Sequence, residues 1–363
     1  MSPTVYLHIG APKTGTTYLQ DRLGRNASAL ADHDVHFPSR SAIVSPGLFH
    51  FRAALDLLGQ DWGGAPGHAE GSWDALVRRV RRKSGSVVIS HEILSPANPD
   101  AVARAMQDLG PDVHVVYTAR DLGRQVPAAW QESIKQGRRW RYSSFARRMD
   151  KGRTWFSRAF DLPTVLGRWG AHVPPENVHL VTVPPSGASR PGDDLWARFC
   201  RVVGIDPAWA PEQSTRANQS LGVAEAAVLR RLNKQLDRMT RREAAYDGLI
   251  RSMLAEDVLA QGTSPRITLP PDAYEWVDRT TGTWIEWIQQ SGIDVVGDVE
   301  ELWAARPEPG ATWRDPDQVS ARKRARVTLN ALAAMTVEAA KRPDPDQTLR
   351  GRVRHGADRL KRW

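Results

Sequence analysis

The first half of the chain alternates short, almost continuously apolar or β-branched runs with segments of helical periodicity. The runs cover residues 4–9, 87–90, 113–118 and 178–183. Such uniform runs are typical of parallel strands buried on both faces, whereas strands with one solvent face alternate apolar and polar residues. Because parallel strands need crossover connections, usually helices, the pattern predicts βαβ units with helices on both faces of a sheet.

Helices are predicted where apolar residues recur at every third or fourth position. One follows the first strand, and another begins after Asn98 as N-cap, with Pro99 in the first helical position, and stops at Gly110. After Pro185 the strand signals stop. The helical patterns beyond it cover residues 221–236, 244–259 and 272–290. We therefore predict a three-layer α/β/α fold around a central parallel sheet, with a helical C-terminal half.

The composition is that of a globular protein that is large enough to bury a core. Of its 363 residues, 41% are hydrophobic and 25% are charged. No run approaches the roughly 18 consecutive apolar residues of a membrane span, and the residues after Met1 lack the basic start of a secretory signal. The single cysteine, Cys200, excludes an intramolecular disulfide and a cysteine-based zinc cluster. We expect a soluble, cytoplasmic protein.

The net charge of +9 belongs mostly to one end of the chain. Residues 319–363 hold twelve Lys and Arg against four Asp and Glu, a net of +8, so residues 1–318 carry only about +1. We predict an α/β domain over residues 1–318 and a basic helical tail over 319–363. The tail places Leu349, Val353 and Leu360 on one helical face, which suits contact with a membrane surface or a protein. Nucleic acid is disfavoured, because no helix-turn-helix, zinc or RNP-like motif accompanies the charge.

A glycine-bearing loop joins the first predicted strand to the first predicted helix. Such a loop exposes backbone N–H groups and a helix N-terminus, which both attract phosphate. With Gly10 and Gly15 as its glycines, a Walker A loop would need lysine at position 16, where this chain has Thr16. Its lysine, Lys13, lies inside the loop, where the ammonium can cover a phosphate or a bridging oxygen. An ordinary Mg-dependent NTPase is therefore disfavoured.

The stretch Pro12-Lys13-Thr14-Gly15-Thr16-Thr17 resembles the 5′-phosphosulfate loop of the sulfotransferases that use 3′-phosphoadenosine 5′-phosphosulfate (PAPS). The resemblance covers about residues 4–205 and implies a P-loop-like fold that requires no metal. It also implies that Lys13 stabilises the leaving-group oxygen. The residues that it assigns to the phosphosulfate are Lys13, Thr14, Gly15, Thr16 and Thr17.

A second motif supports the resemblance. The strand over 113–118 runs into Arg120, which corresponds to the family's strand-terminal arginine that binds the 3′-phosphate. A planar guanidinium suits that task, because it can hold a phosphate through two hydrogen bonds. Many family members have a serine eight residues later, but this chain has Ala128. For the second 3′-phosphate contact we consider Gln125 or Arg124, and we assign Gln125.

The catalytic base is expected where the strand over 87–90 ends, at His91 and Glu92. Catalytic groups in open α/β folds gather beyond the carboxyl ends of the strands. Sulfotransferases use either His or Glu as the base, and the resemblance favours Glu92 slightly over His91. Because adjacent side chains on a strand point to opposite faces, we expect only one of the two to face the site.

These residues predict transfer of a sulfuryl group from PAPS to a hydroxyl or amine. The acceptor is expected to be a small molecule or a glycan. Two alternatives remain open at this point. One is a P-loop-like small-molecule kinase that uses Mg-ATP, and the other is a non-catalytic protein that binds a nucleotide or a nucleic acid.

Overall fold

The computed structural model describes residues 2–41, 43–185, 187, 192–216, 220–242 and 246–341. The chain forms two compact units. Unit 1 comprises residues 1–133, 140–218 and 268–313, and unit 2 comprises residues 134–139, 219–267 and 314–363. The predicted domain boundary after residue 318 stays a prediction. The apolar face predicted around Leu349 lies outside the described residues.

Unit 1 is built on one sheet of six strands, and every neighbouring pair in it is parallel. The strand order is β2-β3-β1-β4-β5-β6. The strands are β1 Thr4–His8, β2 Val35–His36, β3 Ser86–Ser90, β4 Val113–Ala119, β5 Val178–Thr182 and β6 Asp294–Val296. The predicted α/β class with a central parallel sheet is confirmed. The expectation that no strand follows Pro185 is wrong, because β6 pairs with β5.

Helices pack on both faces of this sheet. On one face, α1 (Thr16–Arg25) and α10 (Leu195–Val203) share a buried core with Val88, Val116 and Val181. Tyr117, the neighbour of Val116, points to the other face, where its hydroxyl donates to the carbonyl of Ala159 at 2.9 Å. Ala159 belongs to α8 (Trp155–Phe160). The strand thus contributes alternate side chains to two helical layers.

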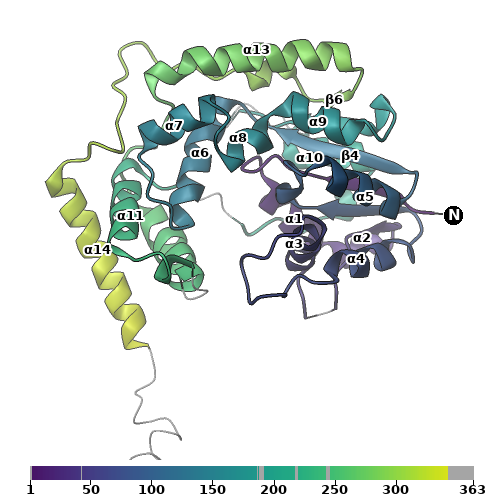
Figure 1. Ribbon diagram of the computed structural model, residues 1–363, viewed down its shortest axis with the longest axis horizontal. Coiled ribbons are helices and arrows are strands. Elements are labelled where there is room, and N and C mark those ends of the chain that lie inside the picture. Colours follow the sequence, from purple (N-terminus) through teal and green to yellow (C-terminus); the bar gives the residue numbers. More distant parts are fainter. Residues whose placement is uncertain are drawn as a thin grey trace, which may run out of the picture. The chain divides into compact units, whose positions relative to one another are not determined.

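The remaining helices of unit 1 fill these layers and their connections (Figure 1). They are α2 Ala27–Ala31, α3 Pro46–Leu57, α4 Ser72–Val80, α5 Pro99–Leu109, α6 Leu122–Lys135, α7 Tyr142–Asp150, α9 Leu162–Gly170 and α13 Tyr274–Ser291. The last two residues of α6 belong to unit 2. As predicted, Asn98 caps α5 by accepting a hydrogen bond from the amide of Ala101 at 2.8 Å, with Pro99 in the first turn.

The described part of unit 2 is mostly helical. It contains α11 Val223–Gln235, the π-helical segment η5 Asp247–Val258 and α14 Ala321–Ala340. Asn233 organises its centre: its amide donates to the carbonyls of Ile134 at 2.7 Å and Arg138 at 3.0 Å, and its oxygen accepts from the Tyr246 hydroxyl at 2.6 Å. The predicted helical patterns over 221–236 and 272–290 are confirmed as helices. Of the pattern over 244–259, residues 244 and 245 lie outside the described residues, and residues 247–258 form the π-helical segment η5.

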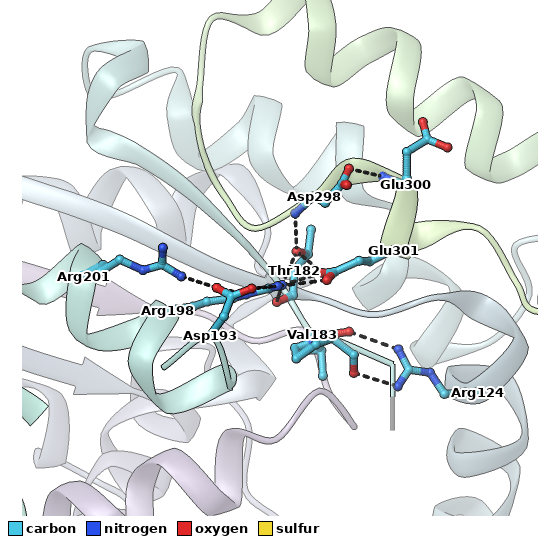
Figure 2. Close-up of polar contacts among 10 residues, drawn as sticks. Arg124, Thr182, Val183, Asp193, Arg198, Arg201, Asp298, Glu300 and Glu301 are labelled. Atoms are coloured by element: carbon cyan, nitrogen blue, oxygen red, sulfur yellow. Dashed lines mark hydrogen bonds and ion pairs between the residues drawn. The ribbon is translucent and has the colours of Figure 1, made fainter. Parts of the chain in front are cut away.

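An ion-pair network around the buried Arg198 lies at the end of β5 (Figure 2). The guanidinium of Arg198, on α10, is 3% exposed and donates to Thr182 at the end of β5 and to the carboxylates of Asp193 and Glu301. The hydrogen bond from Arg198 lowers the pKa of Asp193 to about 2. Every nitrogen of this guanidinium therefore has a partner, and the network joins three segments that lie far apart in the sequence.

We predict that Arg198→Met destabilises the fold by about 2–3 kcal/mol, because Thr182 and the partly exposed carboxylates of Asp193 and Glu301 lose their common hydrogen-bond donor. Arg201→Met is the matched control: Arg201 pairs with the same Asp193, but its side chain is 55% exposed. It should cost about 1 kcal/mol or less. Urea denaturation at pH 7.5 measures both free energies of unfolding, and equal losses in the two variants would contradict the structural role of Arg198.

Candidate functional site

The loop after β1 is hydrogen-bonded to the end of β4. The amide of Thr118 donates to the carbonyl of Gly10 at 2.6 Å, and the amide of Ala11 donates to the carbonyl of Thr118 at 2.8 Å. The side-chain hydroxyl of Thr118 lies 2.5 Å from that of Thr14. The pairing of β1 with β4 thus continues past the strand and into the loop, which fixes its first residues on the sheet.

Two further carbonyls of the loop also accept hydrogen bonds. The side-chain amide of Gln125, on α6, donates to the carbonyl of Pro12 at 2.9 Å, and the guanidinium of Arg120, just after β4, donates to the carbonyl of Lys13 at 3.3 Å. By contrast, the amide N–H groups of residues 15–17 donate to no acceptor within the described part of the chain. The carbonyls of the loop are thus satisfied by protein groups, whereas backbone N–H groups at the N-terminus of α1 are not. Such N–H groups are suited to bind an anion.

Three residues of the loop have left-handed backbone conformations. The φ angles are 108° at Gly10, 66° at Lys13 and 105° at Gly15. A Cβ atom on Gly10 would lie 3.1 Å from both the Cα and the Cβ of Glu92. Glycine is required there because no side chain fits between the loop and Glu92, and left-handed conformation at a lysine is an outlier of the kind that clusters at functional sites.

A buried polar network lies under the loop. His8, the last residue of β1, contacts the Ser90 hydroxyl through Nδ1 at 2.8 Å and the Thr118 hydroxyl through Nε2 at 3.3 Å. The Gln20 amide donates to the Ser90 carbonyl at 2.7 Å. Burial, with the nearby His91, lowers the pKa of His8 to about 3, so its ring is neutral. Sequence reasoning missed His8, because it stands within a β-rich run and carries no motif.

Lys13 does not point into open solvent. Its ammonium lies 2.8 Å from a carboxylate oxygen of Glu132, on α6, and the two side chains are 33% and 9% exposed. Sequence reasoning missed Glu132 as well, because it is 119 residues away and belongs to none of the motifs considered.

Arg120 differs from the other arginines at this edge of the sheet. It is partly buried, its only hydrogen bond among the described residues is the one to Lys13, and its buried Nε has no partner. Burial and the neighbouring Arg124 lower its pKa to about 10. Arg124 is fully engaged, since it binds Asp121 and the carbonyl of Pro184. It also donates to the carbonyl of Val183 (Figure 2). Arg120, unlike Arg124, has donors available for an anionic group.

His91 and Glu92 lie at the carboxyl end of β3, as predicted, and begin the short helix η1 (Glu92–Leu94). The His91 ring caps this helix, because its Nδ1 accepts from the amide of Ile93 at 3.3 Å, and it packs against the ring of Phe51. Burial lowers the pKa of His91 to about 3. His91 is therefore neutral and a weak base, whereas Glu92 lies directly against the loop at Gly10.

The structure thus brings Lys13, Glu92 and Arg120 to one edge of the sheet. Thr14 and Thr16 are buried and point their hydroxyls to the carbonyl of Ala11.

The loop lines neither of two hollows found elsewhere, a cavity of about 90 Å³ beside Trp276 and a groove of about 270 Å³ beside α7. The residues that line the groove are Ser144, Arg147, Arg148, Lys151 and Arg153.

The described residues contain no group of three or more His, Cys, Asp or Glu arranged to hold a metal ion. No helix within the described ranges has both the length and the apolar character that crossing a membrane requires.

Comparisons with known proteins add little to this picture. No protein-family model matches the chain, and no curated protein matches it. A solved structure of a sulfotransferase from Alicyclobacillus acidocaldarius is similar over 68% of this chain and 99% of its own, with 14% sequence identity and a TM-score of 0.39.

We predict that acid destabilises the fold through its buried histidines. Burial is the main cause that lowers the pKa of His8 and His50, which are 0% and 1% exposed, to about 3. The unfolded chain therefore takes up protons below about pH 6.5 that the folded chain does not, and stability falls between pH 6.5 and 3. At pH 5 each histidine should cost about 2 kcal/mol.

Urea denaturation at pH 7.5 and 5.0 measures this loss. His8→Gln should reduce the difference between the two pH values, whereas the exposed His33→Gln should leave it unchanged. An identical pH dependence in His8→Gln and the parent protein would show that His8 is not held neutral by burial.

Proposed function

We propose that this chain is a PAPS-dependent sulfotransferase that acts on a hydroxyl or amine of a small molecule or glycan. The observation that carries the proposal is Arg120, a partly buried guanidinium with an unpartnered Nε, bonded to the carbonyl of Lys13. A nucleotide with phosphates at both its 3′ and 5′ ends needs two neighbouring anion sites. Arg120 and the donors of the loop are suited to those two sites.

The residues of the loop then have distinct tasks. We assign the free amides of residues 15–17 to the 5′-phosphosulfate, with Lys13 and Thr14, and Arg120 to the 3′-phosphate. Gln125 supports the loop through the carbonyl of Pro12. Its direct contact with the 3′-phosphate stays a prediction. This donor is expected in the reducing cytoplasm, where we place the protein.

The proposed reaction needs a base, a stabilised leaving group and aligned reactants. The donor supplies an activated sulfuryl group. Glu92 takes the proton of the acceptor O–H or N–H as that atom forms its bond to sulfur. The bond from sulfur to the bridging oxygen breaks, and Lys13 and the loop amides stabilise the negative charge left on that oxygen. Glu92 is preferred over His91, because His91 is a weak base whose Nδ1 already accepts a hydrogen bond.

Ligand-induced stabilisation tests the nucleotide class. At about 100 times its dissociation constant, 3′-phosphoadenosine 5′-phosphate should stabilise the fold by about 2.7 kcal/mol, because it binds only the folded protein. ATP with Mg²⁺ should shift the melting temperature less. The opposite order would favour the kinase alternative and overturn the proposal.

The matched controls for this measurement are two arginine variants. Arg120→Met should lose most of the shift produced by the bisphosphate. Arg104→Met should keep it, since Arg104 lies on α5 and pairs with Asp74.

Turnover tests the base. Glu92→Gln should lower kcat by about 100- to 10,000-fold, because the amide cannot accept the acceptor's proton. The thermal shift with the bisphosphate should remain, and His91→Gln should retain most of the activity. Full activity in Glu92→Gln would remove Glu92 from the role of base.

A further inference from the structure

Helix α6 buries polar side chains where a packing helix would present apolar ones. Five polar residues between its start and its end are each less than 9% exposed. They are Gln125, Gln131, Glu132, Ser133 and Lys135. Burying such groups is unfavourable unless they find partners, so each needs a specific contact. Gln125 contacts the loop, and Lys135 lies 3.6 Å from the carboxylate of Glu256.

Glu132 contacts the loop lysine. Its carboxylate is almost fully enclosed, whereas the Lys13 side chain remains one-third exposed. Burial therefore fixes the position of the Glu132 carboxylate, and the contact with this carboxylate restricts the Lys13 side chain. Lys13 needs such a contact, because a lysine ammonium stands at the end of four rotatable bonds.

We propose that Glu132 is a positioning residue that holds the Lys13 ammonium at the loop. This inference rests on the proposed function for its kinetic consequence. An ammonium has three N–H donors, and Glu132 accepts one of them at 2.8 Å. The other two N–H groups can then donate to oxygens of the sulfuryl donor. Glu132 acts through Lys13 and does not itself touch the reacting atoms.

The kinetic test is a double-mutant cycle. Glu132→Gln keeps the shape of the side chain and removes its charge, so kcat should fall by up to about 100-fold as the lysine loses its alignment. The Kd for 3′-phosphoadenosine 5′-phosphate should change little. In a Lys13→Ala background, Glu132→Gln should have no further effect on kcat, because the residue acts only through the lysine.

The matched control is another buried glutamate. Glu225, on α11, is 4% exposed and accepts a hydrogen bond from Ser264. Glu225→Gln should leave kcat unchanged, which separates the loss of a buried charge in general from the loss of this contact. Additive effects of Lys13→Ala and Glu132→Gln would overturn the inference.

A second readout does not require turnover. Lys13 is acylated with an N-hydroxysuccinimide ester of acetate, and the rate is followed on the Lys13 peptide by mass spectrometry. The reaction should be several-fold faster in Glu132→Gln than in the parent protein or Glu225→Gln, because the ammonium is no longer held against an enclosed carboxylate. If this difference appears but PAPS supports no turnover, the positioning contact stands and the proposed function fails. Equal acylation rates would overturn the positioning role.

Discussion

The candidate site depends on the hydrogen bonds that Thr118 makes beyond the end of β1. Its backbone pairs with Gly10 and Ala11, and its hydroxyl contacts Thr14 and His8. One residue of β4 therefore holds both the start of the loop and the histidine beneath it. Because β1 lies between β3 and β4, the same parallel register brings the ends of the three strands to one edge. Lys13, Glu92 and Arg120 meet there for that reason.

Two arginines at this edge of the sheet differ in how many of their nitrogen atoms have hydrogen-bond partners within the protein. Arg198 has a partner for each nitrogen of its guanidinium. Its hydrogen bonds connect α10, β5 and the segment after β6. Arg120 is also largely shielded from water, but it makes one bond to a carbonyl and leaves Nε without a partner. A cation in such surroundings keeps its attraction for an anion, because Arg120, unlike Arg198, makes no ion pair with a carboxylate among the described residues.

The fold was largely predictable from the sequence, because the strands of the sheet centre are buried on both faces and must be apolar along their length. β6 was not, since its three residues are partly or fully exposed and form no apolar run. The loop and Arg120 were predictable because glycine, lysine and arginine stand at fixed offsets from strands. His8 and Glu132 were not, because their importance comes from contacts across 82 and 119 residues that no local pattern encodes.

The missing side chain at Gly10 has a geometric consequence. A Cβ atom at position 10 would lie 3.1 Å from Glu92, so the loop and the start of η1 pack together with no side chain of residue 10 between them. Any other residue there would force the two segments apart by a few tenths of an ångström. The spacing between the loop and Glu92 is thus set by the absence of a single carbon atom.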